Sequence, residues 1–378
     1  MVYLDYNATT PLCREAKEAM LPFLDGGFGN PSSIHSEGRV ARAAVDDARD
    51  RLAATLSARP HEIIFTGGGT ESCNLGVIGL ARAHAPRGKH IITSAIEHHA
   101  VLHAFEYLKH FEDFEVTILP ADRAGTVVPE SLEKAIRPET SLVSVMHANN
   151  ETGAIQPVRE LAAICRKHGV LFHTDAVQTF GKLPLNPHAD GLSAVSIAAH
   201  KFYGPKGVGA LFLSAGVAIS RTSHGGAHEN TRRPGTENVV GIAGMAAAAE
   251  AAVSKNSENL RPLRENLWRG IANACPEAVR NGDPALCLSN TLNVSFPGAD
   301  GESLLMGLDL EGICVSSGSA CMVGSVQPSH VLIAMGIPSP TALASVRFSL
   351  GHGTTEEDIR QTIRAVERVL ELQPLAAR

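Results

Sequence analysis

The chain has 378 residues, which is too long for a single small binding module, and its formal net charge is −6. With 19% charged and 44% hydrophobic residues, it has the composition of an ordinary globular protein. A weakly acidic chain has no overall positive charge with which to bind nucleic acid or an anionic membrane, so we expect a small-molecule or protein partner.

The N-terminus, MVYLDYNATTP, lacks a basic segment followed by an apolar core, so no secretory or transit signal is evident and a cytoplasmic location is predicted. The longest run without Asp, Glu, Lys or Arg, 312–346, is interrupted by prolines and makes a poor membrane helix. The seven cysteines are odd in number and form no CxxC pair, which favours reduced thiols.

Short apolar, β-branched segments alternate with helical stretches over most of the chain. This alternation predicts an α/β fold in which a mostly parallel, seven-stranded sheet is wrapped by helices. The predicted strands are 62–65, 90–94, 115–119, 142–146, 170–174, 194–198 and 210–213. The predicted helices between them are 40–56, 73–83, 130–135 and 158–167.

The later part of the chain has a different pattern and predicts a smaller α+β domain. Its predicted helices are 239–252, 260–273, 302–308 and 355–372, and its predicted strands are 291–296, 313–316 and 346–350. We therefore expect a large cofactor-binding domain at 15–255 and a small domain formed by 1–14 and 256–378.

Ligands of open α/β sheets bind beyond the carboxyl ends of the strands, so the residues that follow each strand are informative. After 62–65 comes TGGGTES, in which three glycines lead into a helix N-terminus that can bind a phosphate. An ordinary turn explains this segment equally well, because it lacks the lysine of a nucleotide P-loop and the spacing of a dinucleotide fingerprint.

Histidines follow the strand at 90–94. His99 and His103 lie four residues apart and could bind a metal together with Glu97, but a third strong ligand is not evident and no metal is predicted. The alternatives are structural histidines or a ring that stacks on an aromatic ligand.

Three further strand ends carry polar residues that we expect in the same crevice, namely Asn150, Asp175 and Gln178. Asp175 ends an apolar strand, where a buried carboxylate needs a cationic partner, although a helix N-cap is the alternative. After 194–198 come His200 and Lys201. A partly desolvated lysine can form a Schiff base with an aldehyde, whereas most lysines are only exposed.

One cofactor accounts for these strand ends together. Pyridoxal 5′-phosphate combines a phosphate, a pyridine nitrogen that needs a carboxylate, a flat ring and an aldehyde. The glycine-rich turn, Asp175, His99 and Lys201 match those four requirements.

Over nearly its whole length the chain resembles the cysteine desulfurases of the Nif and Isc type, members of the fold type I, class V aminotransferase group of pyridoxal phosphate enzymes. The motifs that carry the resemblance are, in chain order, YLDYNATTP, GNPSSIHSEGR, GGGTES, EHHA, HANNETGAIQP, HTDAVQ, AHKFYGPKGVGAL, RRPGTENV, SSGSAC, PSHVL and VRFSLG. The resemblance implies conversion of L-cysteine to L-alanine, with sulfur passed to an enzyme cysteine as a persulfide. An iron–sulfur scaffold or another sulfur-acceptor protein would then receive it, and the short end after the last helix favours the Nif type.

The resemblance also implies roles for the cofactor-binding residues. Lys201 would be the Schiff-base lysine, Asp175 the partner of the pyridinium nitrogen, and Gln178 the donor to the phenolic oxygen. His99 would stack on the ring and act in acid–base catalysis. The phosphate would be held by Gly69, Thr70, His200 and, from the neighbouring subunit of a homodimer, Thr236.

For the substrate, the resemblance implies that Asn150, which also borders the cofactor, and Arg347 bind the carboxylate, while Cys321 is the sulfur nucleophile. The segment around Cys321 is small, glycine-containing and uncharged, which is typical of a mobile loop and predicts one at about 318–328. Cys314 lies in an apolar strand pattern, where thiols are usually inert. Ala198 stands where relatives commonly have serine, so one phosphate contact is expected to be absent.

Other activities remain open at this point. A selenocysteine lyase or an aminotransferase could use the same cofactor site. A non-catalytic sulfur or metal carrier, or a thiol-acyl enzyme built on Cys321, would be colourless, whereas a pyridoxal phosphate enzyme is yellow.

Overall fold

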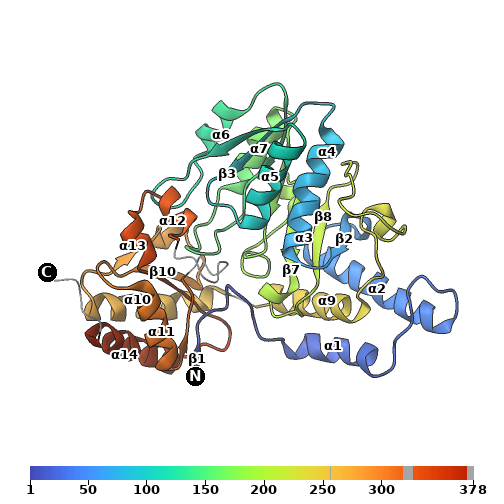
Figure 1. Ribbon diagram of the computed structural model, residues 1–378. Helices are drawn as coiled ribbons and strands as arrows, with labels where there is room; N and C mark the ends of the chain where they lie inside the picture. Colours follow the sequence, from blue (N-terminus) through green and yellow to red (C-terminus); the bar gives the residue numbers. More distant parts are fainter. Residues whose placement is uncertain (256, 318–326, 373–378) are drawn as a thin grey trace.

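The computed structural model of the protein describes residues 1–255, 257–317 and 327–372. Its larger part is built on a seven-stranded sheet with the order β2-β8-β7-β6-β5-β3-β4 (Figure 1). The strands in that order are Ile63–Thr66, Gly209–Leu213, Ala194–Ala198, Leu171–Asp175, Thr140–Ser144, His90–Ser94 and Glu115–Leu119. β8 runs antiparallel to both of its neighbours and the other neighbouring pairs are parallel, so the predicted mostly parallel sheet is confirmed.

The predicted strands agree closely with the structure, with one shift. The strands predicted at 90–94, 115–119 and 194–198 have the observed bounds, whereas β5 begins two residues before the predicted 142–146. The early start has a polar cause: Thr140 is fully buried and its Oγ1 lies 2.7 Å from His90 Nδ1 on the neighbouring strand. Hydropathy does not reveal a buried threonine of this kind.

Helices cover both faces of the sheet because successive strand residues point to opposite sides. Ile92 and Val143 lie in one core and their neighbours Ile91 and Leu142 in the other. The first core packs against α1 Arg14–Asp25, α2 Ser36–Thr55, α6 Pro129–Ala135, α7 Val158–Lys167 and α9 Val239–Val253. The second packs against α3 Gly69–Asn74, a π-helical turn Leu75–Gly79, α4 Leu80–His84 and α5 His99–Phe111.

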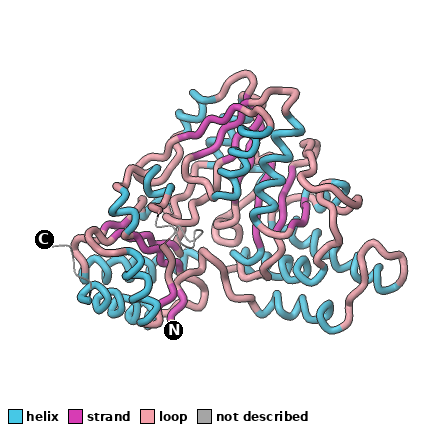
Figure 2. The backbone as a smooth tube through the Cα atoms, viewed as in Figure 1, coloured by secondary structure: helices cyan, strands magenta, loops and turns pink. Residues whose placement is uncertain are grey.

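The C-terminal part has its own sheet and core. Figure 2 shows its strands as a group apart from those of the large sheet. An antiparallel sheet has the order β12-β10-β9, with the bounds Ser345–Ser349, Thr291–Ser295 and Val279–Arg280. Its helices are α10 Arg261–Ala274, α11 Gly301–Leu310, α12 His330–Ala334, α13 Ser339–Leu343 and α14 Glu356–Leu372.

The N-terminal residues belong spatially with this C-terminal part. β1 Val2–Tyr3 pairs in parallel with β11 Ile313–Cys314, so the chain starts beside α11 and α14 before it crosses to α1 (Figure 1). Val2 and Leu4 lie in the same core as Phe348. The domain boundaries at 15–255 and at 1–14 with 256–378 stay predictions.

Short helical segments complete the fold. They are α8 Pro187–Asp190 and the 3₁₀ turns Pro60–Glu62, Ala199–Lys201, Glu229–Thr231, Ser257–Leu260 and Pro284–Leu286. Across the described ranges, no helix combines the length and apolar character that a membrane span requires.

Candidate active site

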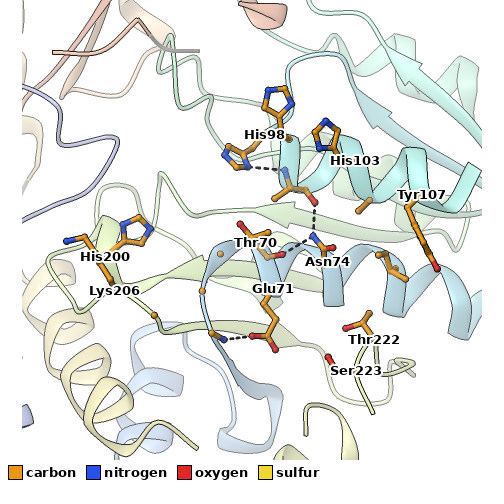
Figure 3. Close-up of a pocket in the computed structure, with 18 of the residues that line it drawn as sticks. Thr70, Glu71, Asn74, His98, His103, Tyr107, His200, Lys206, Thr222 and Ser223 are labelled. Carbon is orange, nitrogen blue, oxygen red and sulfur yellow. Dashed lines mark hydrogen bonds between the residues drawn. The ribbon is translucent and has the colours of Figure 1, made fainter. Parts of the chain in front are cut away.

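A cleft of about 1200 Å³ opens beside the ends of β2 and β3. It is bordered by the glycine turn before α3, by the first turn of α5 and by the segment after β7 (Figure 3). Of the residues predicted from the sequence, it contains Gly69, Thr70, His99 and His200.

The glycine turn fits tightly against the strand ends. Gly68 has a φ of +148°, a conformation that favours glycine. A Cβ atom on Gly69 would lie only 3.0 Å from Val177 Cγ2 and 3.2 Å from Ala198 Cβ. Helical hydrogen bonding begins with the Ser72 N–H, which donates to Gly68 O at 3.0 Å. The N–H groups of Gly69 and Thr70 precede it at the edge of the cleft, where they can bind an anion.

The histidines gather at the start of α5. His98 caps the helix, since its Nδ1 accepts a hydrogen bond of 3.1 Å from the Ala100 N–H. The His99 ring stacks on His103 at a centroid distance of 5.0 Å and lies 4.8 Å from the ring of His330. Burial lowers the pKa of His99, and the neighbouring histidines lower it further.

His99 is therefore neutral at neutral pH, and its buried Nδ1 has no hydrogen-bond partner among the described residues. A neutral imidazole with an unpartnered nitrogen can accept a proton. Within the part of the chain that the structure describes, no three His, Cys, Asp or Glu side chains form a group that could hold a metal ion.

Asp175 is a buried carboxylate at the end of β6. Its Oδ1 accepts a hydrogen bond of 2.9 Å from the Val177 N–H, two residues further along the chain. It thus closes a tight turn rather than capping a helix. Burial raises the pKa of Asp175, while the positive charges of His98 and Lys201 lower it. The carboxylate has the cationic surroundings that its burial requires.

Lys201 ends the 3₁₀ turn after β7 and reaches back to the N-terminal segment. Its Nζ donates to Asn7 O at 2.5 Å and to Ala8 O at 2.9 Å. Gln178 Nε2 donates to the same Asn7 oxygen at 3.0 Å. His200 Nδ1 lies 3.2 Å from Thr9 Oγ1, and burial, with Lys201 and Lys206, lowers the pKa of His200 to about 4.

Arg347 lies on β12, and its guanidinium reaches the same N-terminal segment. It is 3% exposed; its Nη2 lies 2.7 Å from Asp5 Oδ1 and its Nη1 donates to Asn150 O at 3.0 Å. Its buried Nε has no hydrogen-bond partner among the residues described here. One N–H of the guanidinium is therefore available to a carboxylate.

The predicted site residues thus fall into two neighbouring groups joined by residues 5–9. Gly69, Thr70, His99 and His200 border the cleft, while a second group surrounds Asn7 and Ala8 behind it. The second group contains Gln178, Lys201, Asn150 and Arg347. Sequence reasoning quoted the motif that contains Asn7 but assigned no role to this residue or to Lys182.

The cysteines differ in what can be said of them. Cys321 and most of the predicted loop at 318–328 lie outside the described residues. Burial raises the pKa of the thiols of Cys13, Cys73 and Cys287, and it raises that of Cys165 to about 12. A thiol with a raised pKa is a poor nucleophile because the thiolate is the reactive form.

Comparisons with known proteins agree with this arrangement. A family model described as aminotransferase class V matches residues 2–362. The chain is 50% identical over 373 residues to the cysteine desulfurase IscS of Dictyoglomus turgidum, covering 98% of this chain and 94% of that protein. It is 45% identical to the cysteine desulfurase IscS of Methanosarcina thermophila, covering 98% of this chain and 92% of that one.

Solved structures are similar over the same length. A structure titled as a NifS-like protein superposes with a TM-score of 0.92 at 39% identity, covering 98% of this chain and 99% of that one. A structure titled "SspA in complex with cysteine" has a TM-score of 0.83 at 36% identity and covers 93% of this chain and 99% of that one.

Proposed function

Because this chain belongs to the class V aminotransferase family and within it to the cysteine desulfurases, we propose that it converts L-cysteine to L-alanine at the site around Lys201. The observation that carries the proposal is the placement of Lys201, Asp175 and the glycine turn on three neighbouring strand ends. An amine, a buried carboxylate and an anion site are what pyridoxal 5′-phosphate requires.

The described residues fit this cofactor. Lys201 would bind the aldehyde through Nζ, Asp175 would hold the ring nitrogen protonated, and Gln178 Nε2 would donate to the phenolic oxygen. His99 would lie on the ring. Gly69, Thr70 and His200 would hold the phosphate, and Ala198 offers no hydroxyl to it. When bound, the cofactor supplies an electron sink for the negative charge that develops on the substrate α-carbon.

The substrate would be oriented by its carboxylate. Arg347 would bind it through the unpartnered Nε, and the Asn150 side chain would donate a second hydrogen bond. With the carboxylate fixed, the α-proton faces Lys201 Nζ, which would remove it. Neutral His99 would exchange a proton with the substrate thiol through a ring nitrogen.

Cys321 would receive the sulfur. Its thiolate attacks the substrate sulfur, so a new S–S bond forms as the substrate C–S bond breaks. The electron pair of the C–S bond stays on carbon, which takes a proton to become the methyl group of alanine. The persulfide on Cys321 then passes its outer sulfur to a thiol of an iron–sulfur scaffold or another acceptor protein. The Nif-type role and the cytoplasmic location stay predictions.

We also propose that two chains form a homodimer in which Thr236 reaches the phosphate site of the partner. The segment that carries Thr236 is anchored to α2 on both sides, because Arg49 pairs with Glu229 and Arg42 with Glu237, each at 2.6 Å. Thr236 itself is exposed. Sedimentation equilibrium should give twice the chain mass of 39.8 kDa, and a fully active monomer would contradict the proposal.

The visible spectrum of the purified protein tests the cofactor and the reaction together. We expect a yellow protein whose absorption changes when L-cysteine is added, with alanine appearing in the same tube. A protein that stays colourless after pyridoxal phosphate is added would refute the assignment of Lys201. A coloured protein that forms a keto acid instead of alanine would indicate an aminotransferase.

A further inference from the structure

Lys182 lies directly behind the proposed cofactor site and has no part in the reaction described above. It follows Gln178 by four residues, and both it and Lys201 line a small cavity. Its Nζ donates to Gln178 Oε1 at 3.4 Å and to Asn7 Oδ1 at 3.5 Å. Among the described residues, no carboxylate lies within ion-pair distance of its ammonium group.

These two hydrogen bonds determine how both amides are oriented. An ammonium group only donates, so the oxygen atoms of Gln178 and Asn7 must face Lys182 and their NH₂ groups must face away from it. Gln178 Nε2 then points toward Asn7 O beside Lys201, at 3.0 Å. Asn7 Nδ2 points toward Asn150 O, at 3.2 Å.

Asn7 thereby connects all the groups proposed to act on the cofactor and substrate. Its side-chain oxygen also accepts a hydrogen bond of 3.0 Å from Asn290, and its side chain is almost fully buried. Its backbone oxygen accepts from both Lys201 and Gln178. A change in the Asn7 side chain is therefore transmitted to the Lys201 amine through a rigid, hydrogen-bonded residue.

The charges around Lys182 are mostly of the same sign. Burial lowers the pKa of Lys182 to about 7, and the positive charges of Lys201 and Arg347 lower it further. His352, from the loop before α14, also lines the cavity, and the charge of Lys182 helps to lower its pKa. The two phenols at the cavity, on Tyr6 and Tyr203, have raised pKa values and are neutral. A cation without a carboxylate partner costs stability, which makes a functional role the better explanation for its presence.

We propose that Lys182 is a positioning residue, which orients Gln178 and Asn7 toward the cofactor and places a second positive charge beside the Lys201 nitrogen. This inference rests on the proposed function, because the oriented Gln178 amide has its purpose at the phenolic oxygen. The added positive charge disfavours a proton on the Lys201 nitrogen when that nitrogen holds the cofactor.

The test is a pH titration of the visible absorption band of the cofactor-loaded protein. In Lys182→Met the midpoint should move to higher pH by about one unit, because a repelling charge is lost. Lys182→Arg should keep the midpoint near that of the parent. Lys134→Met, which changes an exposed lysine of α6, should leave the titration unchanged.

Lys182→Gln separates orientation from charge and also serves if the Met variant does not fold. Its amide can still donate to Gln178, so cofactor affinity should stay close to that of the parent while the midpoint rises as in Lys182→Met. An unchanged midpoint in either neutral variant, or an equal change in the Arg variant, would overturn the inference. A parent protein that shows no visible band would instead overturn the proposed function.

Discussion

Replacement of Lys201 by alanine is expected to lower alanine formation from L-cysteine by at least about 10³-fold, because one side chain performs two tasks. Its Nζ binds the cofactor aldehyde and then removes the α-proton, and both are lost together. Its position between Asn7 O and Ala8 O, at 2.5 and 2.9 Å, leaves no other described lysine with the same contacts. The rate of alanine formation measures the loss.

Two further measurements make this prediction specific. Borohydride treatment of the parent should attach the cofactor to the peptide that contains Lys201, and the variant should not be labelled there. Lys134→Ala is the matched control, because Lys134 is exposed on α6, and it should keep parental activity. A Lys201→Ala protein with more than about a tenth of parental turnover would show that another group removes the proton.

The second large effect is expected for Cys321→Ser. This variant should bind the cofactor and change colour with L-cysteine, but it should form alanine at least about 10³-fold more slowly, since an alcohol does not accept sulfur. The described cysteines favour this assignment indirectly, because burial raises the pKa values of Cys13, Cys73, Cys165 and Cys287.

Cys314→Ser is the control for that experiment. Cys314 is near in sequence and lies in β11, and its replacement should leave alanine formation close to that of the parent. Mass spectrometry after a single turnover should find one extra sulfur on the peptide that contains Cys321. Alanine formation at the parental rate in Cys321→Ser, or the extra sulfur on another cysteine, would contradict the nucleophile assignment.

Much of the fold could be predicted because it depends on local patterns. β-branched runs predicted the buried strands, and the family motifs predicted the function that the comparisons support. The direction of β8 could not be predicted, since its sequence fits either direction equally well. The helical segment predicted at 73–83 is interrupted by a π-helical turn, which side-chain periodicity does not reveal over so few residues.

The site was predictable only as far as each residue follows a strand. Asp175 and Lys201 could be recognised as chemical groups at strand ends. The links between Lys182 and Asn7 and between Asp5 and Arg347 could not, because each joins residues that are far apart in the chain. A hydrogen bond between such distant residues leaves no periodic signal in the sequence.

The pairing of the first residues with the last strands also determines when the enzyme can be completed during synthesis. The oxygen atoms that hold Lys201 belong to Asn7 and Ala8, and this segment is held by bonds from the Tyr6 and Asn7 N–H groups to Ser349. A nascent chain that has produced the whole large sheet therefore still lacks the partner that positions its reactive amine. Since contacts between distant residues form late in folding, cofactor loading follows release from the ribosome. Deleting the first ten residues would remove a working part of the site and not merely a tail.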